Sequence, residues 1–310
     1  MGFSAQWLAL REAADHRSRH IALQNNVSDY LNWVAEEQMR PIRITDLGSG
    51  TGSNLRALAP CLTAQQAWTL VDHDSNLLQA ARTDLALWAD EVLQADAIEP
   101  LIKQPGMLEP LLISKNHKRI AIHFCCADLV VDVQSILDIP SDLVTAAAFF
   151  DLVAADWLNA FCLLLKKPLY AVLSYDGSEQ WSPPDSSDAA ILSAFHAHQK
   201  TDKGFGCALG PDAAKRMIAI LNERGFNTQN APSPWILDDQ DRGLIEALAT
   251  GTASAVRETN KLDGSLLSKW EHSRRQASHC EIGHMDIFAI DLATQLQFKS
   301  GMQVRSNTKS

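Results

Sequence analysis

The most informative stretch of this sequence is Ile42-Arg-Ile-Thr-Asp-Leu-Gly-Ser-Gly-Thr-Gly-Ser-Asn-Leu55. Its first half alternates apolar residues with others, which predicts a β-strand over residues 42–47. Three glycines follow at every second position: Gly48, Gly50 and Gly52. Glycine accepts positive φ angles, and a helix beginning near Ser53 or Asn54 presents free N–H groups. The pattern therefore predicts a ligand-binding turn between a strand and a helix.

Two acidic residues indicate which ligand suits this turn. Asp46 precedes the first glycine by two positions, where its carboxylate repels a pyrophosphate but attracts an ammonium or hydroxyl group. The G-x-G-x-G spacing also differs from the G-x-G-x-x-G of dinucleotide-binding turns. Asp72 ends a second predicted strand, 68–72, where it can accept hydrogen bonds from a ribose diol, although NAD-binding folds use the same device. The pair fits the amino-acid end of S-adenosylmethionine better than the phosphates of NAD.

Together these two segments resemble the class I, Rossmann-like S-adenosylmethionine-dependent methyltransferases, which share the D-x-G-x-G-x-G turn and the acid-tipped second strand. The resemblance is good over residues 42–177 and elsewhere rests on the order of elements. It implies an α/β fold with a seven-stranded, mostly parallel, doubly wound sheet whose last strand inserts antiparallel. It also implies S-adenosylmethionine as the cofactor. The cofactor-binding candidates in the matching motifs are Asp46, Gly48, Ser49, Gly50, Asn54, Asp72, His73, Asp128 and Leu129.

Asp128 ends the predicted third strand, 120–128. In the family that the sequence resembles, the residue at this place typically meets the adenine amino group. Asp128 is alternatively an N-cap for a following helix. Asp96 would take the adenine role if the third strand were misplaced.

The candidate catalytic residues are Asp151, His196 and His198. Asp151 follows the predicted fourth strand, 143–150, where the substrate-facing motif of the family begins, and it is also a cofactor-binding candidate. The [DNS]-P-P-[YFW] motif of enzymes that methylate amide or adenine nitrogen is missing there. Either histidine is a candidate general base because its pKa lies near neutrality, but a surface role is the alternative.

Two further observations concern charged and metal-binding groups. Arg11, in a predicted N-terminal helix, is a candidate for a bidentate contact with the cofactor carboxylate, against the alternative of an exposed helix charge. The two histidines stand two positions apart and do not share a helix face, which weakens a metal site. No C-x-x-C pair occurs, and we predict no bound metal.

The predicted organisation has three parts. A helical cap covers residues 1–40, the methyltransferase domain covers 41–298, and a flexible, polar tail covers 299–310. Residues 177–210, with two glycines around Phe205, are a predicted lid inserted after the fifth strand. The remaining predicted elements are helices at 4–38, from Ser75, and at 156–166, 211–224, 241–258 and 264–277, strands at 169–175, 233–237 and 282–291, and an insertion with short helices at 90–118.

Composition limits the class of partner. The 310 residues carry a formal net charge of −10, whereas nucleic-acid binders usually present a basic face, so no nucleic acid is expected. No apolar run is long enough to span a bilayer, and no secretory signal is visible, so we expect no membrane association and a cytoplasmic location. The sequence fits either a monomer or a homodimer.

The sequence therefore predicts a methyltransferase that transfers a methyl group to an O, N or S atom of a small metabolite. Two alternatives stay open. One is an NAD(P)-dependent oxidoreductase on a related fold, and the other is a catalytically silent methyltransferase-like module that binds partners.

Overall fold

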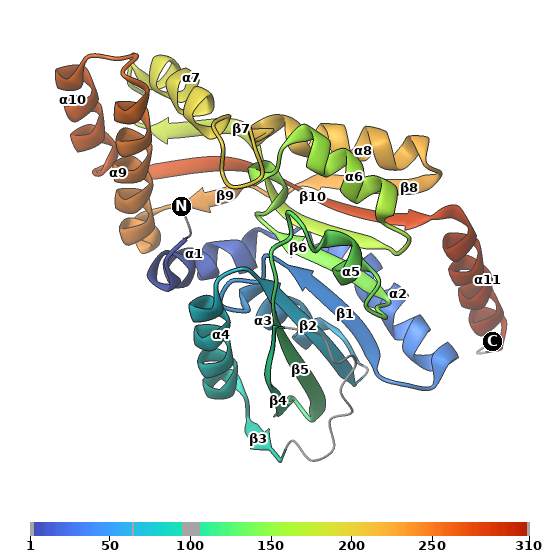
Figure 1. Cartoon of the computed structure of the whole chain (residues 1–310). Coiled ribbons are helices and arrows are strands. Elements are labelled where there is room, and N and C mark those ends of the chain that lie inside the picture. The colour runs from blue at the N-terminus through green and yellow to red at the C-terminus, as the bar shows by residue number, and fades with distance from the viewer. Residues whose placement is uncertain (1–2, 64, 95–105, 309–310) are drawn as a thin grey trace.

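The computed structural model describes residues 3–63, 65–94 and 106–308, and in this part of the chain ten strands form one sheet (Figure 1). The strands are β1 Ile42–Leu47, β2 Gln66–Asp72, β3 Glu91–Leu93, β4 Met107–Lys115, β5 Lys118–Cys126, β6 Leu143–Ala147, β7 Leu169–Ser182, β8 Phe226–Pro232, β9 Trp235–Leu237 and β10 His279–Asp291. Their order is β3-β4-β5-β2-β1-β6-β7-β10-β8, and β9 pairs with β10.

The central strands β5, β2, β1, β6 and β7 pair in parallel, and β10 lies antiparallel between β7 and β8. This order confirms the predicted doubly wound, Rossmann-like sheet with an antiparallel last strand, but the described residues form ten strands rather than the predicted seven, because β3, β4 and β8 extend its edges. Chain order runs one way from β1 to β2 and the other way from β1 to β6. Such a switch point is where open α/β sheets bind ligands, beyond the carboxyl ends of the strands.

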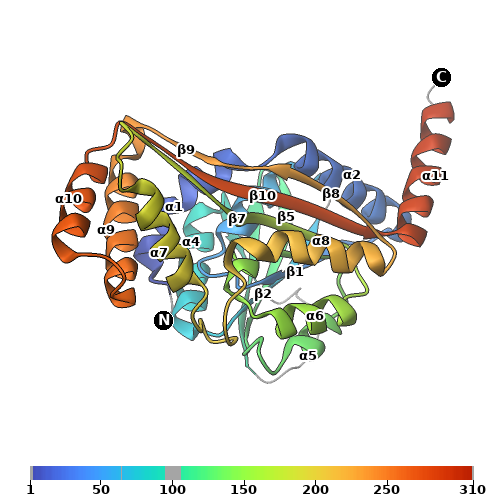
Figure 2. The ribbon, with the colours of Figure 1, turned by 90° about the horizontal axis from the view of Figure 1, so that it is seen from above.

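Helices cover both faces of the sheet (Figure 2). The helices are α1 Ala5–Ser18, α2 Ile21–Gln38, α3 Ser53–Leu58, α4 Ser75–Trp88, α5 Val133–Leu137, α6 Ala155–Leu164, α7 Asp188–Gln199, α8 Ala213–Glu223, α9 Arg242–Thr259, α10 Gly264–Arg274 and α11 Leu292–Thr308. Apolar residues of α2, α3 and α4 form one core with the sheet, and those of α5, α6 and α8 form a second core. None of the described helices has the length and apolar character needed to cross a membrane.

The structure corrects the prediction of short helices over residues 90–118. The described part of this region forms β3 and β4, which extend the sheet beyond β5. Leu111 and Ile113 of β4 are buried in the core, which explains why this segment pairs as a strand. Residues 95–105, including Asp96, lie outside the described residues.

Three other elements differ from prediction. The fifth strand, β7, continues to Ser182 because β10 pairs with it along its length. The edge strand β8 was not predicted; its sequence, Phe-Asn-Thr-Gln-Asn-Ala-Pro, lacks apolar alternation, and backbone pairing with β10 holds it. Residues 299–308, which belong to the tail predicted from the sequence, form the second half of α11.

Candidate functional site

The glycine turn follows β1 directly and has left-handed backbone at each glycine. Gly48, Gly50 and Gly52 have φ angles of 60°, 52° and 77°. A Cβ at Gly48 would lie 2.7 Å from Cδ2 of Phe149, and one at Gly50 would lie 2.8 Å from Cδ1 of Leu8. All three glycines are therefore needed for the backbone angle, and Gly48 is also needed for the space beside Phe149. Gly52 is the N-cap of α3, a position that the sequence assigned to Ser53 or Asn54.

A cavity of about 270 Å³ opens at this turn, at the carboxyl ends of β1, β2, β5 and β6. This volume is near the lower end of small-molecule pockets. The cavity collects most of the predicted site residues: Arg11, Asp46, Gly48, Ser49, Gly50, Asn54, Asp72, His73, Asp128 and Leu129. Three predicted residues do not line it: Asp151, His196 and His198.

Asp46 is fully buried at the end of β1. Its Oδ1 accepts a hydrogen bond of 2.7 Å from Asn54 Nδ2, while its Oδ2 has no partner among the described residues. Burial raises the pKa of this carboxyl to about 7, against the lowering effect of the Asn54 hydrogen bond and the charge of Arg19. Buried polar atoms are normally hydrogen-bonded, so an orphan carboxylate oxygen in a cavity indicates a place for a ligand donor.

Two further residues of the cavity lining each have a polar side-chain atom that is buried without a hydrogen bond to a described residue, Ser49 Oγ and Arg19 Nε. Arg19 Nη1 donates a hydrogen bond of 2.8 Å to Asn54 Oδ1. The Asp46 carboxylate, the Asn54 amide and the Arg19 guanidinium therefore form a chain along one wall of the cavity.

Asp72 shapes the turn as well as lining the cavity. Its Oδ2 accepts a 2.9 Å hydrogen bond from the Gly50 N–H, and its Oδ1 accepts one of 3.0 Å from the Asp74 N–H. Each carboxylate oxygen has a second lone pair, so both remain able to accept from a ligand hydroxyl.

Asp128 lines the cavity just beyond β5, which ends at Cys126 rather than at Asp128. Its Oδ1 accepts a 2.9 Å hydrogen bond from the Val130 N–H. The N-cap of α5 is Asp132, not Asp128. The carboxylate therefore stabilises a turn before α5 and faces the cavity.

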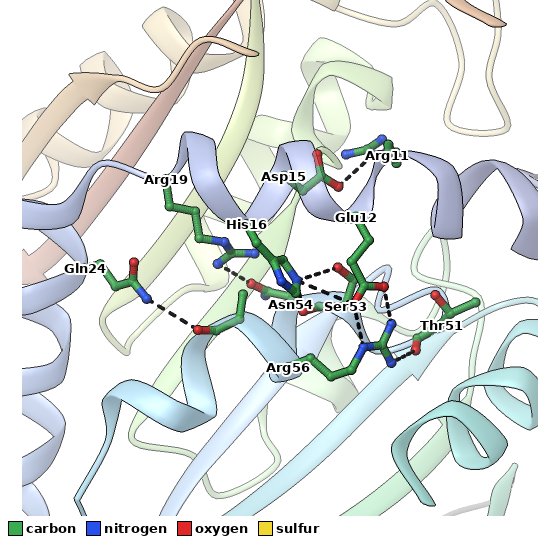
Figure 3. A network of polar contacts seen from close by, with 11 residues as sticks. Arg11, Glu12, Asp15, His16, Arg19, Gln24, Thr51, Ser53, Asn54 and Arg56 are labelled. Carbon is green, nitrogen blue, oxygen red and sulfur yellow. Dashed lines mark hydrogen bonds and ion pairs between the residues drawn. The ribbon is translucent and has the colours of Figure 1, made fainter. Parts of the chain in front are cut away.

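Helix α1 closes the cavity over the glycine turn (Figure 3). Glu12 pairs with Arg56 of α3, whose Nη1 donates a 2.8 Å hydrogen bond to the Thr51 carbonyl within the turn. His16 Nε2 lies 3.0 Å from Ser53 Oγ. Asp15 and Arg19, which are not among the site residues predicted from the sequence, also line the cavity. Asp15 lies four positions after Arg11 on the same face of α1, and Arg19 is the C-cap of that helix.

An apolar wall faces these polar groups. Phe149 follows β6, and its ring centroid lies 5.7 Å from that of Phe205, which in turn lies 5.2 Å from Trp157. Of the predicted lid, 177–210, only the segment 203–205 lines the cavity. The other residues of that stretch form the end of β7, α7 and their connections.

Asp151 lies in the 3-10 turn Phe150–Leu152, next to the cavity-lining Leu152. Its Oδ1 is buried and has no partner among the described residues. Burial raises the pKa of Asp151 to about 6.

The two histidines lie on α7, away from the cavity lining. His196 Nε2 is 3.1 Å from the Tyr175 hydroxyl, and burial lowers its pKa. His198 Nε2 is 3.0 Å from Glu258 Oε2 of α9. These contacts give both side chains a packing role, and the structure does not bring either to the cavity as the sequence predicted.

No protein-family model matches the chain, and no curated protein matches it significantly in sequence. Among solved structures, a cyclopropane-fatty-acyl-phospholipid synthase-like protein from Lactobacillus casei is 16% identical, with 93% of this chain and 94% of that chain covered and a TM-score of 0.44. An S-adenosylmethionine-dependent methyltransferase from Thiobacillus denitrificans, in complex with S-adenosyl-L-homocysteine, is 13% identical, with 93% and 99% covered and a TM-score of 0.39. The fold is established by the observed strand order.

Proposed function

We propose that this protein is an S-adenosylmethionine-dependent methyltransferase that acts on a small molecule at an O, N or S atom. The observation that carries the proposal is the unpartnered Oδ2 of Asp46, which lies beside the glycine turn in the same cavity as Asp72. A buried carboxylate with a free oxygen fits the ammonium of the cofactor. A pyrophosphate would meet like charge at the same place.

Several residues of the cavity lining would hold different parts of the cofactor. Asp46 binds the ammonium, Asp72 accepts from the ribose hydroxyls, and Asp128 with Leu129 holds the adenine. When bound, the cofactor supplies a methyl group already activated by its sulfonium. The protein mainly positions the acceptor and excludes water, for which Phe149 and Phe205 form the apolar wall.

Asp151, next to the cavity-lining Leu152 but not itself in the lining, is the base that the sequence offers for an acceptor that must lose a proton. Its raised pKa, about 6, lies close to the operating range of a general base. The cytoplasmic location, the lid role of residues 177–210, and a monomeric or dimeric state remain predictions from the sequence.

The test is a calorimetric titration of the purified protein with S-adenosylhomocysteine, NAD and NADP. We expect only S-adenosylhomocysteine to bind, and Asp72→Asn to weaken it about tenfold or more, since a charged acceptor is lost. The asparagine keeps one oxygen for the Gly50 N–H. The control is Asp239→Asn, which removes an exposed carboxylate paired with Arg242. It should leave the affinity for S-adenosylhomocysteine unchanged.

Two results would contradict the proposal. Preferential binding of NAD or NADP would favour an oxidoreductase. Binding of S-adenosylhomocysteine without any labelled product from cell metabolites and methyl-labelled cofactor would favour a silent binding module.

A further inference from the structure

Two arginines, eight positions apart in the sequence, reach the cavity. One comes from a face of α1 and the other from its C-terminal end. Arg11 and Arg19 both line the cavity, with Asp15 between them. Figure 3 shows the two guanidinium groups toward opposite ends of the helix. A helix rises 1.5 Å per residue, so their backbones stand about 12 Å apart. The two arginines therefore serve different parts of the cavity.

Arg19 belongs to the end of the cavity that contains Asp46. It contacts Asn54 Oδ1 at 2.8 Å, and Asn54 Nδ2 contacts Asp46 Oδ1 at 2.7 Å. The ammonium and the carboxylate of an amino acid are attached to the same carbon atom. A ligand whose ammonium binds Asp46 therefore places its carboxylate within reach of Arg19, which lines the same end of the cavity. This assignment moves the carboxylate contact from Arg11, where the sequence had placed it.

Arg11 is held rigidly and still has free donors. Its Nε donates a 2.8 Å hydrogen bond to Asp15 Oδ2, and the guanidinium lies 5.3 Å from the ring centroid of Trp235. Trp235 Nε1 donates a 3.0 Å hydrogen bond to the other oxygen of Asp15. Within the described residues, Arg11 Nη1 and Nη2 have no hydrogen-bond partner, although the side chain is only 10% exposed. A fixed guanidinium with two free N–H-bearing groups matches the geometry of an oxyanion.

The surroundings of Arg11 describe the rest of the ligand. Leu8 lies three positions before Arg11 on α1, so the two side chains share a helix face. Leu8, Phe149 and Phe205 give the cavity apolar walls. Lys203, beside Phe205, also lines the cavity and forms no ion pair with any described residue.

We propose that Arg11 binds the oxyanion group of the methyl acceptor, and that the acceptor is a small carboxylate or phosphate with an apolar body. This inference rests on the proposed methyltransferase function. It adds a substrate class that the glycine turn and its acids do not specify. Lys203 is the second cation that favours an anion in the same cavity.

The test uses three probes of similar shape: 3-phenylpropionate, 2-phenylethyl phosphate and the uncharged 3-phenylpropanamide. Each is titrated calorimetrically into the protein, with and without saturating S-adenosylhomocysteine. We expect at least one anion to bind about tenfold or more tighter than the amide, the size of effect that a charge-assisted contact gives. The stronger of the two anions distinguishes a carboxylate site from a phosphate site.

The decisive variant is Arg11→Lys, because a lysine supplies one cation for Asp15 but leaves no free guanidinium donors. It should weaken the anion about tenfold or more while leaving the Kd of S-adenosylhomocysteine within about twofold. Arg19→Lys should instead weaken binding of S-adenosylhomocysteine and leave the affinity for the anion unchanged. The matched control is Arg17→Lys. Arg17 lies on the same helix, and its exposed side chain pairs with Asp241. This substitution should change neither affinity.

The outcomes separate the two proposals. Equal binding of amide and anions, no anion binding at all, or a loss of S-adenosylhomocysteine affinity in Arg11→Lys would overturn the anion site. If the protein instead bound anions through Arg11 but never bound S-adenosylhomocysteine, the anion site would stand and the methyltransferase function would fail. Unchanged thermal unfolding of Arg11→Lys would confirm that the variant is folded.

Discussion

At the scale of single residues, the cavity is defined by side chains that are buried with unused bonding capacity. Asp46 is the clearest case, because one oxygen is satisfied by Asn54 and the other has no partner in the described structure. Burial makes the ionised form of this carboxyl unfavourable, which raises its pKa from 3.8 to about 7. A bound cation would stabilise the ionised form and offset that cost.

This raised pKa predicts how ligand binding depends on pH. Below pH 7 the free protein holds a proton on Asp46 that a bound ammonium would displace. Affinity for S-adenosylhomocysteine should therefore rise about tenfold from pH 6 to pH 8 and then level off. Calorimetry in buffers of different ionisation enthalpy should show proton release near pH 6.

The raised pKa of Asp46 also makes the stability of the free protein depend on pH. Because the pKa of Asp46 is higher in the folded than in the unfolded state, its contribution to stability is present below pH 4 and is lost as pH rises through about 7. Asp46→Asn should abolish the pH dependence of binding along with most of the affinity. A pH dependence that survives in this variant would assign the proton to another group, such as Asp151.

At the scale of elements, the turn between β1 and α3 combines left-handed backbone angles with close packing on two sides. Gly48 packs against Phe149 after β6, and Gly50 packs against Leu8 of α1. The turn is also tied to β2 through the hydrogen bond from the Gly50 N–H to Asp72. One short segment therefore fixes the relative positions of four elements around the cavity.

We predict that Gly48→Ala costs roughly 2 kcal/mol or more of unfolding free energy, because the left-handed angle is strained and the new Cβ meets Phe149. It should also weaken S-adenosylhomocysteine. The matched control is Gly251→Ala in α9, where nothing lies within 4 Å of the added Cβ. That change should stabilise the protein by about 0.5–1 kcal/mol. Urea unfolding of both variants checks this, and a neutral Gly48→Ala would contradict it.

At the scale of the whole molecule, one buried carboxylate joins three distant parts of the chain. Asp286 of β10 is fully buried. It accepts hydrogen bonds from the His20 N–H between α1 and α2 (2.9 Å), the Leu173 N–H of β7 (2.9 Å) and the Ser233 hydroxyl between β8 and β9 (2.7 Å). Leu173 has a left-handed φ of 55°, and the β7–β10 register shifts between Met285 and Ile287. Asp286 therefore anchors the helical cap to an irregularity in the sheet.

We predict that Asp286→Ala lowers the unfolding free energy by roughly 3 kcal/mol or more, because three donors lose a charged acceptor. Asp286→Asn should cost less, since its remaining oxygen still accepts. Because the cap carries Arg11 and Arg19, binding of S-adenosylhomocysteine should weaken in the alanine variant even where it is folded. Thermal unfolding and calorimetry measure the two effects. A loss below about 1 kcal/mol would show that the anchor contributes little.

The sequence by itself determined the central parallel strands of the sheet and the centre of the cavity. The spaced glycines, Asp46 and Asp72 are local signals, since each lies at or just after the end of a strand whose apolar pattern is visible in the chain, and parallel strands bring their carboxyl ends together. The predicted positions of β1, β2 and α4 agree with the structure for the same reason.

Only the tertiary structure decided which distant groups complete the site. Edge strands such as β8 are held by backbone pairing rather than by side-chain pattern, so the sequence does not reveal them. The histidines of α7 have suitable chemistry, but packing against Tyr175 and Glu258 turns them from the cavity. The roles of Arg11 and Arg19 depend on α1 crossing the glycine turn, and that crossing is fixed by long-range contacts such as Glu12 with Arg56 and His20 with Asp286. Local propensity has no information about such contacts, because they form only when the sheet and the cap pack together.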